Sequence, residues 1–190
     1  MAVQSIRAKA TIEDLYDIDE KAEIVNGEIH RLMATGRMPT YAAFQIAVSL
    51  QLHVRSSKLS GIAVPDNAGF HVILPNRESF SPDAAYYEGP NSGMRFFEGT
   101  PRFAVEVRSA NDYGPVAEIE MTEKRADYFA AGTEVIWDVD LLNEPIVRKY
   151  NTPDAARPTM TYRRGETADA TFLLGDAVPG WSMAVDDLFE

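Results

Sequence analysis

Arg102-Phe103-Ala104-Val105-Glu106-Val107 is the stretch that decides the fold, because it is short and apolar around one carboxylate. Such a run predicts a central strand that is covered on both faces. Residues 115–131 follow with a helical pattern and end at Gly132, which predicts a helix with a glycine stop. A second apolar strand covers residues 134–139. Strand, helix and strand in this order predict a right-handed βαβ unit.

The N-terminal third predicts a short helix, a hairpin and a long helix. Thr11 and Asp14 have the spacing of a capping box at the start of the short helix. Asn26-Gly27 separates two strand-like runs, and this dipeptide favours the type I′ turn of a β-hairpin over residues 22–33. Pro39 can occupy the first position of an amphipathic helix, and Gly61 is expected to stop it.

The remaining segments predict more strands and one long loop. Residues 88–99 are rich in Gly, Pro, Asn and Ser and are expected to form a loop. Further strands are expected at residues 62–64, 69–74, 84–87, 145–150 and 159–162, with one helical turn at 185–189. The chain has no internal repeat or linker, so we expect one α/β domain over residues 1–190.

The composition excludes several classes of site. The 190 residues are 45% hydrophobic and 25% charged, which is typical of a globular protein, and none is cysteine. Disulfides, thiolate zinc sites and a cysteine nucleophile are therefore excluded, and a reducing compartment fits. Residues 1–10 lack the apolar core of a secretory signal, and no apolar run approaches a membrane span. We expect a cytoplasmic protein with no membrane partner.

The net charge of −11 is evidence against a general nucleic-acid coat protein, because affinity for nucleic acid comes largely from Lys and Arg. A local basic groove remains compatible with this charge, because fields focus locally in clefts. The basic residues available for such a groove are Arg31, Arg37, Arg102, Arg108, Arg125 and Arg148.

Two carboxylates do not fit their surroundings. Glu106 lies in the most apolar strand, where a charge is unfavourable unless it is paired or bound to a metal. Asp83 follows Ser81-Pro82 directly before the strand at residues 84–87. Two adjacent strands that present carboxylates at one level would offer the oxygen ligands that Mg²⁺ prefers. We therefore expect Asp83 and Glu106 to bind a divalent metal.

Two bases complete the candidate site. Lys124 lies on the helix after the Glu106 strand, from which it could orient water or offset charge on a phosphate. Arg108 shares a strand face with Glu106 and could assist or substitute. Each residue also has an ordinary interpretation: Asp83 as a turn residue, Glu106 paired to Arg108, and Lys124 as a solvated helix residue.

This order of residues resembles the PD-(D/E)XK nuclease superfamily and, within it, the Uma-two family of restriction endonucleases. The motifs that carry the resemblance are Ser81-Pro82-Asp83, the Glu106 strand up to Ser109, and Lys124-x-x-x-Tyr128 before a Trp-containing strand. Residues 22–29 and 178–189 also resemble that family.

The resemblance implies a restriction-endonuclease-like mixed sheet flanked by helices, with Asp83 and Glu106 as metal ligands. It implies that Glu23 is an additional acid of the site, and that Lys124 replaces the motif lysine, since the position two after Glu106 holds Arg108. The chain departs from the family at residues 38–41, where relatives commonly carry a His, and at residues 110–115, where only Asp112 matches.

Two functions follow as alternatives. The first is a Mg²⁺-dependent endonuclease acting on DNA, with Mn²⁺ as a possible substitute and a homodimer as the expected assembly. The second is a nuclease-derived binding or assembly module without robust cleavage, which the net charge favours. Ser109 lacks the Gly-x-Ser-x-Gly elbow of a hydrolase nucleophile. The three His residues have no metal-ligand spacing.

Overall fold

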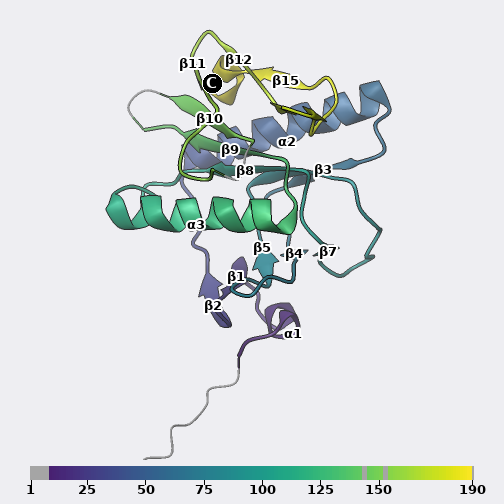
Figure 1. The fold of residues 1–190 in the computed structure, drawn as a ribbon, viewed down its shortest axis with the longest axis vertical. Coiled ribbons are helices and arrows are strands. Elements are labelled where there is room, and N and C mark those ends of the chain that lie inside the picture. Colours follow the sequence, from purple (N-terminus) through teal and green to yellow (C-terminus); the bar gives the residue numbers. More distant parts are fainter. Residues whose placement is uncertain (1–8, 143–144, 152–153, 190) are drawn as a thin grey trace, which may run out of the picture.

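A mixed six-stranded sheet forms the centre of the molecule (Figure 1). The computed structural model describes residues 9–142, 145–151 and 154–189. β8 and β9 are parallel, whereas the other neighbours in the sheet are antiparallel. In spatial order the strands are β11 (Met160–Arg163), β10 (Ile146–Tyr150), β9 (Val135–Asp140), β8 (Phe103–Val107), β6 (Ala84–Tyr87) and β3 (Ile62–Pro65). The predicted mixed sheet around a βαβ unit is therefore confirmed.

One face of this sheet packs against α2 (Arg37–Ser57) and the C-terminal part of the chain (Figure 1). The core on this side contains Phe103, Trp137 and Trp181, whose ring centroids lie 4.9 to 5.4 Å apart. The C-terminal elements are β12 (Thr167–Asp169), β13 (Thr171–Phe172), β14 (Gly175–Asp176), β15 (Ser182–Ala184) and the 3₁₀ helix η1 (Val185–Leu188). Both tryptophans are thus core residues.

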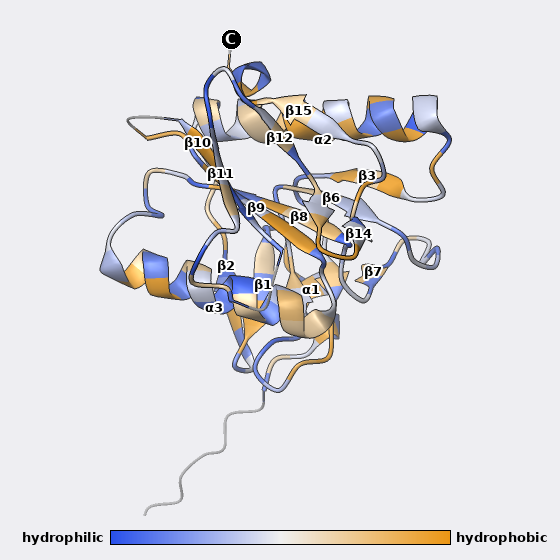
Figure 2. Ribbon diagram, turned by 45° about the horizontal axis from the view of Figure 1, so that its top comes forward, coloured by the Kyte–Doolittle hydropathy of each residue, from blue (hydrophilic) through white to orange (hydrophobic). Residues whose placement is uncertain are grey.

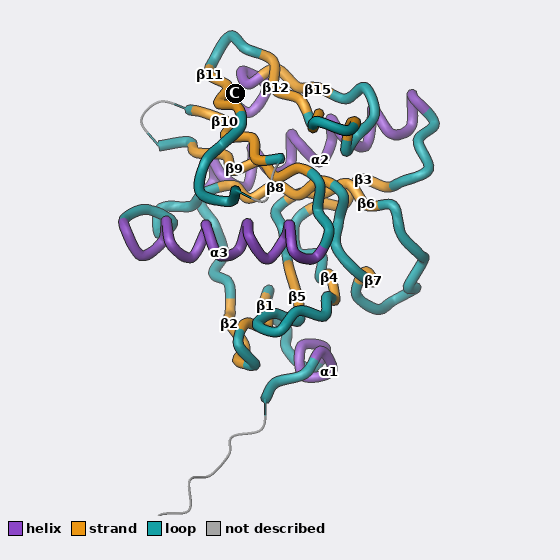
Figure 3. Tube along the Cα trace, in the orientation of Figure 1, coloured by secondary structure: helices purple, strands orange, loops and turns teal. Residues whose placement is uncertain are grey.

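The opposite face is covered by α3 (Pro115–Ala131), and the N-terminal elements lie beyond that helix (Figures 1 and 3). Tyr128 of α3 stacks on Phe80 at a centroid distance of 3.9 Å. The other elements on this side are α1 (Ile12–Tyr16), β1 (Ala22–Val25), β2 (Glu28–Arg31), β4 (Phe70–His71), β5 (Ser79–Phe80) and β7 (Phe97–Glu98).

Strand alternation decides which side chains reach each face. In β8, Phe103, Val105 and Val107 belong to the core beneath α2, whereas Ala104 belongs to the core on the α3 side. Since successive side chains of a strand alternate, Glu106 also projects toward α3. The apolar strands β8 and β9 lie between the two helices in Figure 2. The candidate carboxylate therefore lies in the layer between the sheet and α3.

Several predicted boundaries differ from the structure. α2 begins at Arg37, so Pro39 lies within the first turn, where backbone N–H groups have no partner inside the helix. The helix ends before Lys58, which is left-handed with φ 55°, and Gly61 is not its stop. Gly61 instead allows close approach, because a Cβ there would lie 2.4 Å from the ring of Tyr86.

The strand predictions need four corrections. Only Phe70–His71 of residues 69–74 is a strand, and it belongs to a separate small sheet with β5 and β7. β7 lies within the segment predicted as a loop, and β5 was not expected. β2 ends at Arg31 rather than at residue 33. The predicted absence of a secretory signal concerns residues 1–10, of which residues 1–8 lie outside the described part of the chain.

Candidate active site

Asp83 and Glu106 lie side by side on neighbouring strands. Ala84 pairs with Val105, and Asp83 continues this ladder by donating its N–H to the Val105 carbonyl at 2.9 Å. Cross-strand neighbours of this kind share one face of the sheet. The Oδ2 atom of Asp83 accepts the N–H of Val107 at 2.7 Å, which fixes the carboxylate beside β8. The two predicted metal ligands are therefore adjacent.

Lys124 reaches the same place from α3. Its Nζ atom lies 2.8 Å from Oε2 of Glu106 and 2.9 Å from Oε1 of Glu23. Tyr128, one helical turn further along, donates its hydroxyl to Oε1 of Glu106 at 2.7 Å. Residues four apart on a helix face the same direction, so one face of α3 supplies both contacts. The structure therefore brings together Glu23, Glu106 and Lys124, which are far apart in sequence.

Glu23 is the buried acid behind Lys124. It lies in β1 and is 4% exposed. Arg77 donates to its Oε2 at 2.7 Å, and the backbone N–H of Ser81 donates to its Oε1 at 2.8 Å. Arg77 also pairs with Asp127 at 2.7 Å. The hairpin that contains Glu23 is thereby tied to the segment that leads into β6.

Lys21 is a second ammonium group at the site that sequence reasoning missed. Its Nζ atom lies 2.9 Å from Oδ1 of Asp83 and 2.6 Å from Oδ1 of Asp66. The signal was present, because Lys21 precedes Glu23 by two residues and alternation places both on one face of the strand. Tyr128 was also missed as a site residue, although its spacing from Lys124 indicated a shared helix face.

Burial and like charge raise the pKa of Glu106 to about 7. Burial is the largest cause, Lys124 opposes it, and the carboxylates of Asp83 and Glu23 add to it. Burial also acts against the charged form of Lys124, but Glu106 and Glu23 together hold the pKa of its ammonium above the usual value. Burial and the neighbouring carboxylates thus outweigh the opposing effect of Lys124 on the pKa of Glu106.

Arg108 faces the same layer but binds other partners. Its guanidinium donates to both oxygens of Asp138, at 2.6 and 2.7 Å, and also pairs with Glu118. Asp138 is fully buried and also accepts from Arg125 at 2.9 Å. These four residues form what we call the Asp138 cluster. Arg108 is thus held beside the candidate site by the Asp138 cluster.

The basic residues proposed for a DNA groove are largely paired within the fold. Arg102 binds Glu88 at 2.5 Å and Glu134 at 2.8 Å. Arg148 binds Asp140 at 3.0 Å, and Arg31 binds Glu20 at 3.1 Å. The aromatic residues beside this region also pack within the fold: Tyr86 and Tyr87 are buried, Phe96 packs on Tyr16, and Phe97 packs on Phe70.

The donor set fits a hard divalent cation that keeps open positions. Across residues 9–142, 145–151 and 154–189, no three His, Cys, Asp or Glu side chains are grouped so that they could hold a metal by themselves. Mg²⁺ commonly takes only one or two carboxylates and completes its shell with water and substrate phosphate. Asp83 and Glu106 meet that requirement, because they come from neighbouring strands and lie on one face of the sheet.

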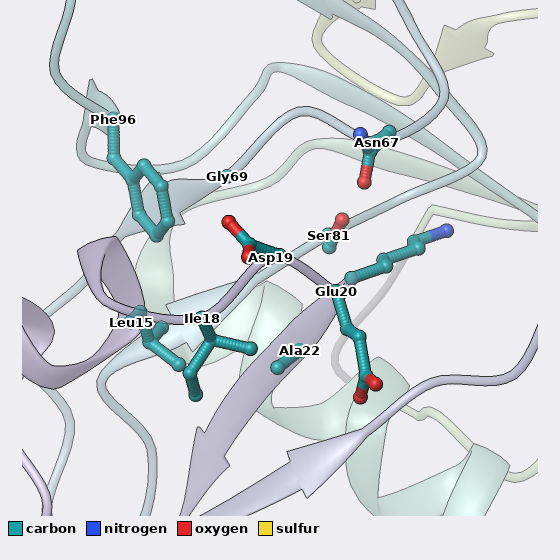
Figure 4. Close-up of a pocket in the computed structure, with 10 residues that line it drawn as sticks. Leu15, Ile18, Asp19, Glu20, Ala22, Asn67, Gly69, Ser81 and Phe96 are labelled. Atoms are coloured by element: carbon teal, nitrogen blue, oxygen red, sulfur yellow. The ribbon is translucent and has the colours of Figure 1, made fainter.

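A pocket of about 230 Å³ adjoins Lys21 (Figure 4). Leu15, Ile18 and Phe96 form its apolar side, and Asn67 and Ser81 lie across from them. Two carboxylates, Asp19 and Glu20, also line it. The pocket therefore opens next to one of the two ammonium groups of the site.

No helix among the described residues is long and apolar enough to cross a membrane.

Comparison with known proteins gives no match among curated sequences. One solved structure, described as "a putative nuclease belonging to DUF820 from Anabaena variabilis ATCC 29413", is 17% identical. The superposition covers 94% of this chain and 97% of the chain of that structure, with a TM-score of 0.65. The two proteins therefore share a fold. The model of one family, Uma2, described as "Putative restriction endonuclease", matches residues 11–186. With that match over nearly its whole length, the chain belongs to the Uma2 family.

Proposed function

We propose that this protein is a metal-dependent endonuclease that hydrolyses phosphodiester bonds of DNA. Family and fold both point to a nuclease of the restriction-endonuclease type. The observation that carries the proposal is the meeting of Asp83 and Glu106 from neighbouring strands with Lys124 at 2.8 Å from Glu106. Acids and a lysine in this arrangement suit the transfer of a phosphoryl group. Acyl transfer fits less well, because Ser109 does not lie in a Gly-x-Ser-x-Gly nucleophile elbow.

Asp83 and Glu106 would hold the ion, with Mg²⁺ as the expected metal and Mn²⁺ as a substitute. When bound, such an ion polarises a phosphoryl oxygen and lowers the pKa of a bound water. Each carboxylate oxygen has two lone pairs, so the hydrogen bonds from Val107 and Tyr128 leave acceptor capacity for an ion.

The remaining residues have supporting roles. Lys124 is the group that orients the attacking water and offsets charge on the phosphate, because its ammonium lies against Glu106. Glu23 holds Lys124 in place from the opposite side at 2.9 Å. Arg108 contributes through the Asp138 cluster, which fixes the end of β8 next to Glu106.

A plasmid-nicking assay with added Mg²⁺ or Mn²⁺ tests the proposal. We expect cleavage by the wild-type protein, and loss of at least about a hundredfold in Asp83→Asn, Glu106→Ala and Lys124→Met, as is usual when a charge-stabilising group is removed. Arg55→Met changes an exposed base in the last turn of α2 and is a matched control that should cleave normally. Cleavage that persists in Glu106→Ala would remove Glu106 from the mechanism.

A binding or assembly module without robust cleavage is the second candidate. The internal pairing of Arg102, Arg108, Arg125 and Arg148 favours it, because these bases are not free to meet a phosphate backbone. Sensitive detection of nicked plasmid at several metal concentrations separates the two functions. Absence of nicking by the folded protein at every metal concentration supports the module.

Three broader proposals accompany the nuclease. We propose that residues 1–190 act as one domain, that the protein is cytoplasmic, as its cysteine-free composition suggests, and that it forms a homodimer. Double-strand cleavage with one site per chain favours two copies, and two-fold dimers are the commonest assembly. Light scattering coupled to size exclusion measures the mass in solution. A mass of one chain at micromolar concentration argues against the dimer.

A further inference from the structure

Lys21 lies on the oxygen of Asp83 that an incoming metal ion would need. The Oδ2 atom of Asp83 is held by the backbone N–H of Val107 at 2.7 Å. That contact leaves Oδ1 as the freer oxygen, and the ammonium of Lys21 lies 2.9 Å from it. The Lys21 ammonium therefore lies next to the Asp83 oxygen that the proposed divalent ion would bind.

Lys21 has a second acceptor within reach. Its Nζ atom already lies 2.6 Å from Oδ1 of Asp66, in the turn that follows β3. The side chain of Asp66 is 44% exposed, whereas that of Asp83 is 14% exposed. The ammonium can therefore leave Asp83 without losing its only counterion. Lys21 also lines the pocket of about 230 Å³, so open space adjoins its side chain.

The charge around Lys21 agrees with this geometry. Burial opposes the charged form, yet Asp83, Asp66 and Glu106 keep the pKa of Lys21 above its usual value. Glu106 contributes through space, so the ammonium interacts electrostatically with both proposed metal ligands. A cation bound by those ligands would in turn repel Lys21.

We propose that Lys21 competes with the divalent ion for Asp83, and that Asp66 receives the Lys21 ammonium when the ion binds. This inference rests on the proposed function, because it takes Asp83 and Glu106 as metal ligands. Metal affinity is then set partly by the exchange of Lys21 between two aspartates. Without metal, Lys21 would neutralise the charge of Asp83. The site would then need a higher concentration of free metal to fill than it would without Lys21.

Binding of Mn²⁺ followed by the electron paramagnetic resonance signal of the free ion tests the proposal without DNA. We expect Lys21→Met to bind Mn²⁺ roughly tenfold more tightly than wild type, since a positive charge next to the ion is removed. Lys21→Arg keeps the charge and should bind no more tightly than wild type. Lys58→Met makes the same change on an exposed residue after α2 and should leave affinity unchanged.

A double-mutant cycle tests the part assigned to Asp66. Asp66→Asn removes the alternative acceptor and should weaken Mn²⁺ binding in the wild-type background. The same substitution should have a clearly smaller effect in the Lys21→Met background, where no ammonium needs a new partner. Equal effects in both backgrounds would mean that Asp66 acts only by its own charge, and would overturn its role as acceptor.

The outcomes separate this inference from the proposed function. Mn²⁺ binding that is unchanged or weaker in Lys21→Met, together with weakened binding in Asp83→Asn, overturns competition by Lys21 and leaves the metal site intact. Absence of Mn²⁺ binding in both wild type and Lys21→Met overturns the metal site and the inference with it. Circular dichroism of each variant establishes that it is folded before its affinity is compared.

Discussion

Lys124 and Glu106 lie eighteen residues apart in the sequence, and their charged groups lie 2.8 Å apart in the structure. The distance is short because α3 is the crossover between the parallel strands β8 and β9 and must pack back over the sheet. Lys124 also binds Glu23, so one buried ammonium serves two carboxylates. Removal of this ammonium is therefore expected to leave both carboxylates without one of their counterions.

Lys124→Met should destabilise the metal-free protein by about 3 kcal/mol at pH 8, because breaking a buried ion pair leaves unpaired charge behind. The loss should shrink toward pH 5, where Glu106 takes up a proton. Urea unfolding at the two pH values measures both effects. Lys124→Arg, which keeps the charge, should lose less stability at pH 8. An equal loss at the two pH values contradicts the ion-pair explanation.

Glu106→Gln should remove a loss of stability that the wild-type protein shows as the pH rises. The folded pKa of Glu106, about 7, lies above its ordinary value of 4.5, so the folded state binds this proton more tightly than the unfolded chain does. The group's stabilising contribution is complete below pH 4.5 and is lost as pH rises to 7, which amounts to about 3 kcal/mol.

The measurement is the free energy of unfolding in EDTA between pH 4 and pH 8.5. Glu106→Gln should be more stable than wild type at pH 8 and should approach or fall below it at pH 5. The difference curve isolates Glu106 from the other titrating groups. A flat difference between the two proteins over this range would show that Glu106 titrates as an ordinary carboxyl group.

Tyr128→Phe should shift the pH profile of cleavage upward. The Tyr128 hydroxyl donates to Oε1 of Glu106 at 2.7 Å and stabilises its ionised form, so its removal raises the pKa of Glu106 further. We expect several-fold slower cleavage near pH 7 that recovers toward pH 9, and a stability loss of about 1 kcal/mol. A uniform loss of rate at every pH would indicate displaced geometry instead. Tyr16→Phe, outside the site, is the control.

Asp138→Asn should reduce the free energy of unfolding strongly and reduce the cleavage rate of the folded protein only slightly. Asp138 is fully buried between Arg108 and Arg125, so its neutralisation leaves two guanidinium groups without full compensation. A loss of about 3 to 5 kcal/mol is expected. Chemical denaturation measures it, and nicking at 10 °C reports the rate of the folded fraction. Arg108→Met should likewise lose stability with little change in the nicking rate of the folded protein. A slower nicking rate without a loss of stability would instead mean that Arg108 takes part in the reaction.

Much of the fold was predictable because its strongest signals are local. The βαβ unit followed from two apolar strands around a helical pattern, and the hairpin followed from Asn26-Gly27, whose φ angles of 55° and 76° are those of the expected turn. The small sheet of β4, β5 and β7 was not predictable, since its two-residue strands are too short for a periodic pattern.

The site was predictable where a residue conflicted with its local surroundings. Glu106 stood out as a carboxylate in an apolar strand, and the structure places Lys124 and Glu23 beside it. Lys21 and Arg77 did not conflict with their local surroundings, because a base beside a strand or in a turn is ordinary. The only local hint was the two-residue spacing of Lys21 from Glu23. The importance of Lys21 and Arg77 depends on contacts across more than fifty positions of the chain, which no local pattern records.

The Asp138 cluster has a consequence for which base can reach the candidate site. Asp138 stands opposite Glu106 in the parallel ladder and binds Arg108, the cation that directly follows β8. A base at position 108 is therefore engaged by the acid of β9, whereas Lys124 of α3 is engaged by Glu106 and Glu23. Arg108 and Lys124 approach the same layer of the molecule, yet their neighbours divide them between two separate ion-pair networks.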